Sequence, residues 1–231
     1  MNTRKFAFLF CAVVSVFMSC KNKDLLPATP LITDLNVVNA TSDTIKYFIN
    51  GTRQNDLSSI YVGGQTAYQQ VISGTQNYKI ADATGSFPVL FSTEYTLTDS
   101  AYYSLFVAGA TADKAFLSLD PIAAANTTID ADTTGLLSVI RFVNASPSVG
   151  SLNVTVGTGD TVNITNAAFK YVGSYLPFTS GTKEVKVYPA GSTTAVVDTT
   201  ITFVTHNVYT LFTHGQLNGK GVSAFSVTLT N

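Results

Sequence analysis

Short runs of apolar and β-branched residues alternate with polar residues along most of the chain. From Leu31 onward, Val, Ile, Thr, Tyr and Phe recur in brief segments that Gly, Asn, Asp, Ser and Thr separate. Such runs predict β-strands, and no segment after Leu31 shows the 3.6-residue period of an amphipathic helix. The predicted strands are 32–39, 44–49, 68–72, 77–82, 89–98, 102–108 and 115–120, then 137–144, 152–156, 169–174, 183–188, 195–203, 208–213 and 222–229. The pattern therefore predicts an all-β protein.

One segment interrupts this series of strands. Residues 121–135 are rich in Ala, Asn, Asp and Thr and lack a strand pattern, which is typical of a linker. The linker separates residues 31–120 from residues 136–231, and each part has the length of a β-sandwich of about seven strands. The chain is thus expected to hold two tandem antiparallel β-sandwich domains.

The two parts repeat three short motifs in the same order. Each motif recurs after an offset of 105, 107 or 106 residues, and the pairs are 38–41 with 143–146, 73–75 with 180–182, and 103–106 with 209–212. A repeat of this length corresponds to a whole domain, because the repeats of solenoid proteins are only about 20–50 residues long. We expect the repeated Asn39 and Asn144 to stabilise turns, and the glycines of the second motif to adopt a positive φ. Tyr, Leu and Phe of the third motif are expected to pack in the sandwich cores.

The second part resembles a known family. Residues 140–147, with the sequence Ile-Arg-Phe-Val-Asn-Ala-Ser-Pro, the strand 152–156 and Tyr175 followed by 180–182 resemble the domain of unknown function 4397 over most of 136–231. The first part resembles it weakly, since Asn36 stands where the second part has Arg141. The resemblance implies sandwiches of transthyretin-like or immunoglobulin-like type in exported, cell-surface bacterial proteins, and it supplies no catalytic residues.

The N-terminus has the pattern of an export signal. Arg4 and Lys5 precede an apolar run that ends at Ser19-Cys20, and polar residues follow. This arrangement resembles the cleavage site of bacterial lipoproteins, although an ordinary signal peptide with an incidental cysteine is the alternative. We expect a signal peptide at 1–19, a lipidated tether at 20–30, and a membrane anchor through acylated Cys20. The expected location is the cell envelope, at the outer membrane of a gram-negative bacterium.

The composition argues against several kinds of partner and reaction. Charged residues make up 12% and the formal net charge is −1, which argues against nucleic acid as a partner. Cys11 and Cys20 are the only cysteines, so the mature chain has no internal disulfide and no cysteine nucleophile in its folded part. No metal ion or other cofactor is expected.

Catalytic residues are hard to find in the sequence. His206 and His214 bracket one predicted strand, which keeps them too far apart to share a metal ion. Glu94 and Glu184 are the only glutamates, and they lie in different predicted domains, so no glycosidase pair is evident. A hydrolase that uses His206 or His214 with a nearby Asp stays an alternative. Asp130 and Asp132 in the linker are candidates for calcium, or for ordinary solvated residues.

Two sets of residues are candidates for surface chemistry. Asp followed by Ser or Thr and then by Ala, Ile, Val or Thr resembles an O-glycosylation acceptor of exported bacterial proteins, although Asp-led turns give the same triplets. The acceptors would be Thr44, Ser100, Thr133, Thr161 and Thr199. Exposed tyrosines can bind glycans, and the candidates are Tyr171, Tyr175 and Tyr188.

These features favour a non-enzymatic lipoprotein of the cell envelope that acts as a surface binding or structural module. A glycan or an envelope protein is the expected partner. The alternatives are a subunit of a surface assembly, which would pair through an edge strand, and the hydrolase described above.

Overall fold

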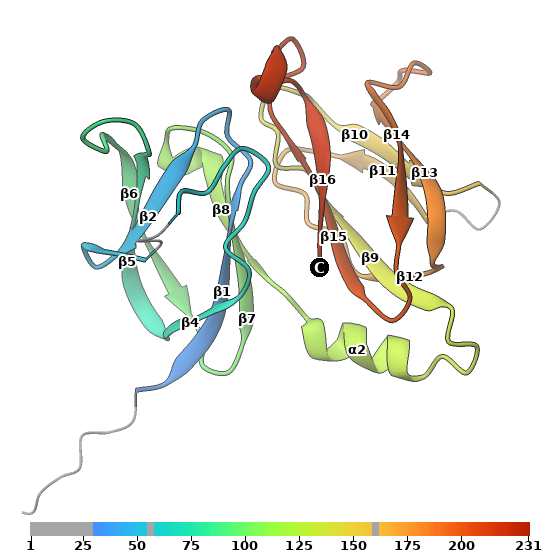
Figure 1. Cartoon of the computed structure of the whole chain (residues 1–231), viewed down its shortest axis with the longest axis horizontal. Helices are drawn as coiled ribbons and strands as arrows, with labels where there is room; N and C mark the ends of the chain where they lie inside the picture. The colour runs from blue at the N-terminus through green and yellow to red at the C-terminus, as the bar shows by residue number, and fades with distance from the viewer. Residues whose placement is uncertain (1–29, 55–57, 159–161) are drawn as a thin grey trace, which may run out of the picture. The chain divides into compact units, whose positions relative to one another are not determined.

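The computed structural model describes residues 30–54, 58–158 and 162–231. Leu31–Asn231 form one compact unit. Figure 1 shows its strands in two groups, β1–β8 and β9–β16, which we call the first and the second sandwich. The predicted signal peptide, Cys20 and Thr161 lie outside the described residues.

The first sandwich consists of two four-stranded sheets. One has the order β4-β1-β7-β8 and the other the order β3-β2-β5-β6. The strands are β1 Ile32–Asn39, β2 Ile45–Ile49, β3 Thr52–Arg53, β4 Gln69–Ile72, β5 Gly74–Asp82, β6 Val89–Leu97, β7 Tyr102–Val107 and β8 Ala115–Leu119. A short 3-10 helix, η1 Ala112–Lys114, precedes β8.

The second sandwich repeats this topology strand for strand. Its sheets have the orders β12-β9-β15-β16 and β11-β10-β13-β14. The strands are β9 Leu137–Val143, β10 Leu152–Val156, β11 Val162–Ala167, β12 Leu176–Thr179, β13 Gly181–Pro189, β14 Val197–Phe203, β15 Val208–His214 and β16 Ser226–Thr230, with a 3-10 helix, η2 Gly221–Ser223, before β16. The all-β class and the two tandem sandwiches predicted from the sequence are confirmed.

Three details of the prediction are wrong. Each sandwich has eight strands among the described residues, and three of these strands, β3, β11 and β12, were not anticipated. Residues 169–174 form no strand, and Val172 makes only an isolated bridge to Val143. The sheets are also not purely antiparallel, since β1 pairs with β7, and β9 with β15, in parallel.

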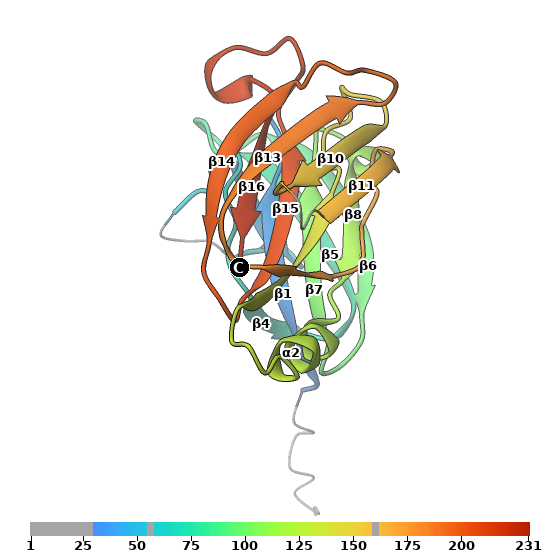
Figure 2. The ribbon, with the colours of Figure 1, turned by 90° about the vertical axis from the view of Figure 1, so that its right-hand side faces the viewer.

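The predicted linker contains a helix, α2 Ile122–Asp130, which the sequence analysis did not anticipate. Its alanines favour helix, and Ala125 and Ile129 share one face because they are four residues apart. Both are buried and pack with Val139 of β9. Figures 1 and 2 show α2 beside one end of the second sandwich.

The repeated Ser-Gly-Thr motifs mark a corner between the two sheets of each sandwich. Gly74 and Gly181 have φ of 91° and 103°, which confirms the expected positive φ. Each begins the strand that follows β4 or β12, so the chain passes from one sheet to the other at this point. The motif is therefore a corner instead of the loop turn that was expected.

Each sandwich has its own apolar core between its sheets. The period of two places Leu35 and Val37 of β1, and Ile140 and Phe142 of β9, in these cores. A tyrosine from each repeat closes one end of its core. The hydroxyl of Tyr209 donates to the Val204 carbonyl at 3.1 Å and accepts from the Val204 amide at 2.8 Å.

The repeated asparagines hold turns, as the sequence predicts. Asn39 is fully buried. Its Nδ2 donates to the carbonyls of Asp43 and Ile60 at 2.7 and 2.8 Å, and its Oδ1 accepts from the Thr41 amide at 3.0 Å. The side chain thereby replaces backbone partners that the turn lacks. Asn144 holds the corresponding turn of the second sandwich through the Ala167 carbonyl at 2.9 Å.

The substitution Asn39→Ala should lower the free energy of unfolding by about 1–3 kcal/mol, because buried backbone groups would lose their partners. Urea unfolding followed by circular dichroism would measure the change. The control is Asn163→Ala on the exposed side of β11, which should have little effect. Equal losses for the two variants would contradict the turn role of Asn39.

Candidate functional site

The two sandwiches contact each other through the outward faces of the sheets that contain β1 and β9. We call this contact the seam. Val38 and Phe106 of the first sandwich pack with Val143 and Phe212 of the second in one buried apolar cluster. The Phe106 and Phe212 ring centroids are 6.0 Å apart. Phe106 and Phe212 therefore lie in the seam, and their predicted place in the sandwich cores is wrong.

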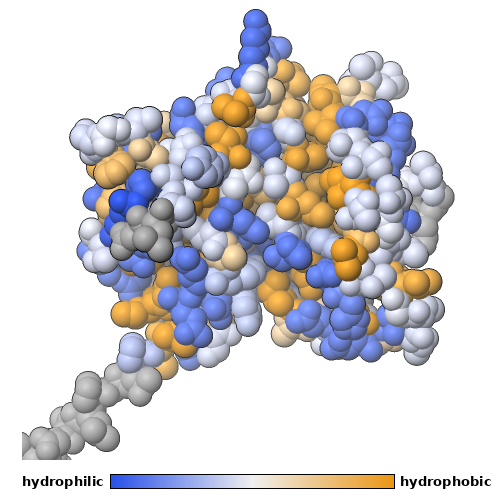
Figure 3. Space-filling model, in the orientation of Figure 1, coloured by the Kyte–Doolittle hydropathy of each residue, from blue (hydrophilic) through white to orange (hydrophobic). Residues whose placement is uncertain are grey.

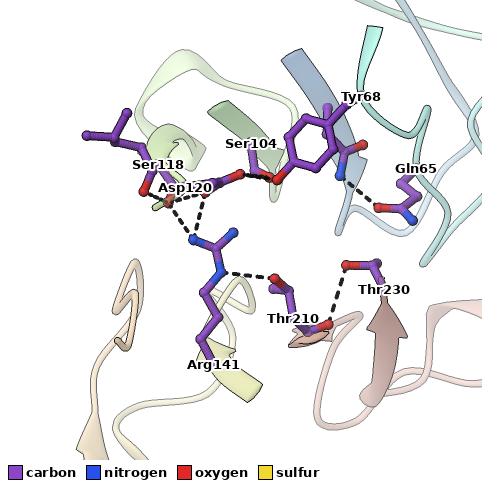
Figure 4. A network of polar contacts seen from close by, with 10 residues as sticks. Gln65, Tyr68, Ser104, Ser118, Asp120, Arg141, Thr210 and Thr230 are labelled. Atoms are coloured by element: carbon purple, nitrogen blue, oxygen red, sulfur yellow. Dashed lines mark hydrogen bonds and ion pairs between the residues drawn. The ribbon is translucent and has the colours of Figure 1, made fainter. Parts of the chain in front are cut away.

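A buried ion pair crosses the seam next to this cluster. Arg141 Nη1 of β9 lies 2.6 Å from Asp120 Oδ1, which follows β8, and the side chains are 1% and 0% exposed. Arg141 Nε donates to Thr210 Oγ1 at 2.9 Å. Figure 4 shows these contacts between groups from both sandwiches.

Three hydroxyls complete the surroundings of Asp120. Tyr68 and Ser104 both donate to Asp120 Oδ2 at 2.6 Å, and Ser118 donates to Oδ1 at 2.9 Å. Burial, followed by the charge of Asp120, raises the pKa of Tyr68 above its usual value, so the phenol stays a donor. Together with Arg141, these hydroxyls give both oxygens of Asp120 hydrogen-bond partners. Such partners offset the cost of burying the charge of a carboxylate.

The guanidinium of Arg141 also lies over the Tyr175 ring, 4.9 Å from its centroid. Its Nη2 is buried and has no hydrogen-bond partner among the described residues. The ring face offers that nitrogen a weaker, electrostatic partner. Burial raises the pKa of Tyr175. Arg141 thus fixes the position of the Tyr175 ring at the edge of the seam.

A cavity of about 240 Å³ opens beside this network. Tyr68 and Tyr175 line it together with Ile122 of α2. Most of the other lining residues are polar and come from both sandwiches and from α2, namely Asn36, Gln65, Ser104, Asn126, His206, Asn207, Thr210, Thr230 and Asn231, and Ala67 and Val208 complete the lining. We call this space the seam cavity. It combines aromatic rings with amides and hydroxyls, which is typical of a small-ligand site.

Comparison with known proteins finds a family that matches the second sandwich. Residues 138–230 match the model of the family Domain of unknown function (DUF4397). This match confirms the resemblance drawn from the motif around Asn144, and no family covers the first half. No curated protein matches the chain.

One solved structure found in the comparison is CBMbc, a family CBM26 module of Amy13K from Eubacterium rectale, in complex with maltoheptaose. It is 11% identical to this chain, covers 86% of this chain and 97% of its own, and has a TM-score of 0.27. The likeness is too low for an inference about this chain.

The predicted tyrosines have different surroundings in the DUF4397 domain. Tyr175 lines the seam cavity, as described. Tyr171 is exposed in the turn before β12, and Tyr188 is half-buried in β13. The structure therefore does not bring the three together with one ligand site, and only Tyr175 contributes to the seam cavity. The sequence analysis missed Tyr68, Asn36 and Gln65, which belong to the less typical first half.

The two histidines of the DUF4397 domain lie in different surroundings. His206 is exposed, lines the rim of the seam cavity, and has its Nε2 3.3 Å from Asp130 Oδ1 at the end of α2. His214 is buried, and its Nδ1 has no hydrogen-bond partner within the described part of the chain. A side chain at Gly63 would come within 3.0 Å of His214 Nε2, so His214 packs tightly against the first sandwich.

The other candidates do not form a cluster. The expected acceptors Ser100, Thr133 and Thr199 are exposed and Thr44 is half-buried, all four in the described residues. Asp132 is bonded to the backbone and side chain of its own turn, which lowers its pKa to about 2. Among residues 30–54, 58–158 and 162–231, no three Asp, Glu, His or Cys side chains group as metal ligands would.

Removing either partner of the buried ion pair should destabilise the protein strongly. We expect Asp120→Asn and Arg141→Met each to lower the free energy of unfolding by about 3–5 kcal/mol, because the other charge stays buried. The double variant should lose less than the sum. Urea unfolding of all three would measure this.

A matched control exists on the surface of the DUF4397 domain. Glu184 and Lys186 form an ion pair at 2.8 Å with side chains 40% and 29% exposed. Glu184→Gln should have a much smaller effect, since water screens that pair. If Asp120→Asn were no more harmful than Glu184→Gln, the structural role of the seam pair would be refuted.

Stability should depend on pH through His214. Burial lowers the pKa of His214 in the folded protein below its usual value of 6.5. As the pH falls below 6.5, the unfolded chain therefore binds a proton that the folded protein does not yet bind. The contribution is fully present above pH 6.5 and is lost as the pH falls below it. Urea midpoints at about pH 7.5 and about pH 5.5 should therefore differ less for His214→Phe than for the wild type. The variant Asn163→Ala, which keeps both histidines and changes an exposed position of β11, should keep the wild-type difference.

Proposed function

We propose that the chain is a non-enzymatic binding module, held at the cell envelope by lipid on Cys20, whose ligand site is the seam cavity. The observation that carries this proposal is the cavity itself, which two interlocked sandwiches and α2 build together. Because a buried ion pair and an apolar cluster fix the seam, the cavity is preformed. Preformed sites bind without the cost of ordering their walls.

The groups in the cavity favour binding over catalysis. Tyr68 donates to Asp120, and its raised pKa makes it a poor base or nucleophile. His206 at the rim faces Asp130 at 3.3 Å. A nucleophile needs a base within hydrogen-bond reach. The Ser104 hydroxyl has Asp120 at 2.6 Å, but the charge of that carboxylate is held by Arg141 and by the other hydroxyl donors, which makes it a weak base.

The surface supports a module that is exposed to water. On the face drawn in Figure 3, apolar side chains occur in small groups between polar ones. Of the helices in the described residues, none has the length and apolar character needed to cross a bilayer. In this proposal, the chain is attached through the acylated Cys20, at the end of the tether predicted for residues 20–30.

Native mass spectrometry of the full-length protein from its own cell membranes would test both parts of this proposal. We expect an acylated N-terminal Cys20 and a small non-covalently bound molecule. Asn126 lines the cavity from the exposed side of α2, so Asn126→Trp should fill the cavity and displace the molecule. Ala123→Trp, on the same helix but outside the cavity lining, is the control and should retain it.

Each arm of the test can fail separately. A protein that begins elsewhere than Cys20, or lacks acyl groups, would overturn the anchor. Absence of any bound molecule that Asn126→Trp displaces would overturn the seam cavity as the ligand site.

A further inference from the structure

We infer that the seam cavity takes a neutral, hydroxyl-rich ring, that is, a single sugar residue, either free or at the end of a glycan. This inference rests on the proposed function, because it names the ligand class of the same site. It is carried by three properties of the cavity, which are its charge balance, the kind of polar groups that it leaves open, and its size.

Among the described residues, the lining of the cavity offers no unpaired cationic side chain. Arg141, next to the cavity, is neutralised by Asp120 at 2.6 Å, and that carboxylate also receives three hydroxyl donors. At the rim, His206 Nε2 lies 3.3 Å from Asp130 Oδ1. An anionic ligand would therefore lose its hydration without gaining a positive countercharge, which is costly. A neutral ligand avoids this cost.

The open polar groups include both donors and acceptors. Asn36 Nδ2 donates to Gln65 Oε1 at 2.7 Å, which leaves Gln65 Nε2 as a donor toward the cavity lining. Asn207 Nδ2 donates to the Thr205 carbonyl at 2.9 Å, which leaves Asn207 Oδ1 as an acceptor. Asn126 lines the cavity from an exposed position of α2, and its amide carries both a donor and an acceptor. Sugar hydroxyls also donate and accept at once, so they match such a mixed set.

The lining also includes apolar surface, and the space is small. Tyr68, Tyr175 and Ile122 offer carbon surface against which the C–H face of a sugar ring can pack. The volume of about 240 Å³ is below the roughly 300–1,000 Å³ of sites for drug-sized ligands. One ring fits this description, and any further sugars of a glycan would extend outside.

Calorimetric titration of the full-length protein in detergent would test the ligand class. The probes are neutral sugars (glucose, galactose, fucose and N-acetylglucosamine), their charged counterparts glucuronate and galacturonate, and the zwitterion leucine. We expect at least one neutral sugar to bind and its charged counterpart to bind at least about tenfold more weakly, which equals about 1.4 kcal/mol.

Two variants on α2 locate the binding. Asn126→Leu removes the amide at an exposed helical position where Leu is a good helix former, so folding should be unaffected. It should weaken sugar binding about tenfold, the equivalent of one hydrogen bond. Ala123→Leu should bind as the wild type does. Melting temperatures of both variants would verify that they fold.

The outcomes separate the ligand class from the proposed function. Tighter binding of the uronates or leucine, with sensitivity to Asn126→Leu, would overturn the sugar but leave the seam cavity as the site. Sugar binding that ignores Asn126→Leu would place the sugar elsewhere and overturn the inference. If no probe binds, the inference is judged by native mass spectrometry of the molecule that Asn126→Trp displaces. A mass that does not fit a sugar would overturn the inference. No such molecule at all would overturn the proposed function as well.

Discussion

The buried contact between Arg141 and Asp120 is the interaction on which the rest of the seam depends. Burying two charges is costly, and the attraction between them offsets that cost only when the remaining polar atoms are also bonded. Here Tyr68, Ser104 and Ser118 complete the carboxylate, and Thr210 completes part of the guanidinium. Because these partners come from both sandwiches, one ion pair fixes the relative position of the walls on both sides of the seam cavity.

The two repeats explain why the seam forms, and their differences explain why it has one arrangement. Val38 and Phe106 recur as Val143 and Phe212, so each sandwich brings the same apolar patch to the contact. Apolar packing alone has little directional preference. Arg141 replaces Asn36 in the second repeat, and this single difference supplies the charge that meets Asp120. We infer that the ion pair selects the observed arrangement over other ways of stacking two similar faces.

The sequence was sufficient for most of the strands and for the asparagine turns, but not for the seam. Alternation in β1 and β9 marks Leu35 and Ile140 as core residues, and Asn144 follows its strand as a turn residue should. The same alternation places Arg141 on the face opposite the core, where a charged residue is normally solvated. Asp120 is the last residue of a predicted strand, directly before the predicted linker. Nothing local in the sequence pairs residues that only the packing of two sheets brings together.

One signal of the seam was nevertheless present. β9 is apolar at both Phe142 and Val143, and β15 at both Leu211 and Phe212, so these strands have apolar residues on both faces. Strands that are buried on both faces have near-continuous apolar runs, and a two-layer sandwich with one solvated face does not require them. Continuous runs in the repeated motifs therefore indicate a third layer.

The mixed character of the seam also explains why a cavity persists there. Its apolar cluster can close tightly, because side chains such as Phe106 and Phe212 interdigitate. At the polar end, amides such as those of Asn36 and Gln65 satisfy only part of their hydrogen bonding with each other, and collapse would bury the rest unpaired. Water or a ligand must occupy such a space. The ion pair fixes the distance between the two sandwiches beside the cavity. A ligand that hydrogen-bonds to those amides can therefore replace water there without a conformational change of the protein.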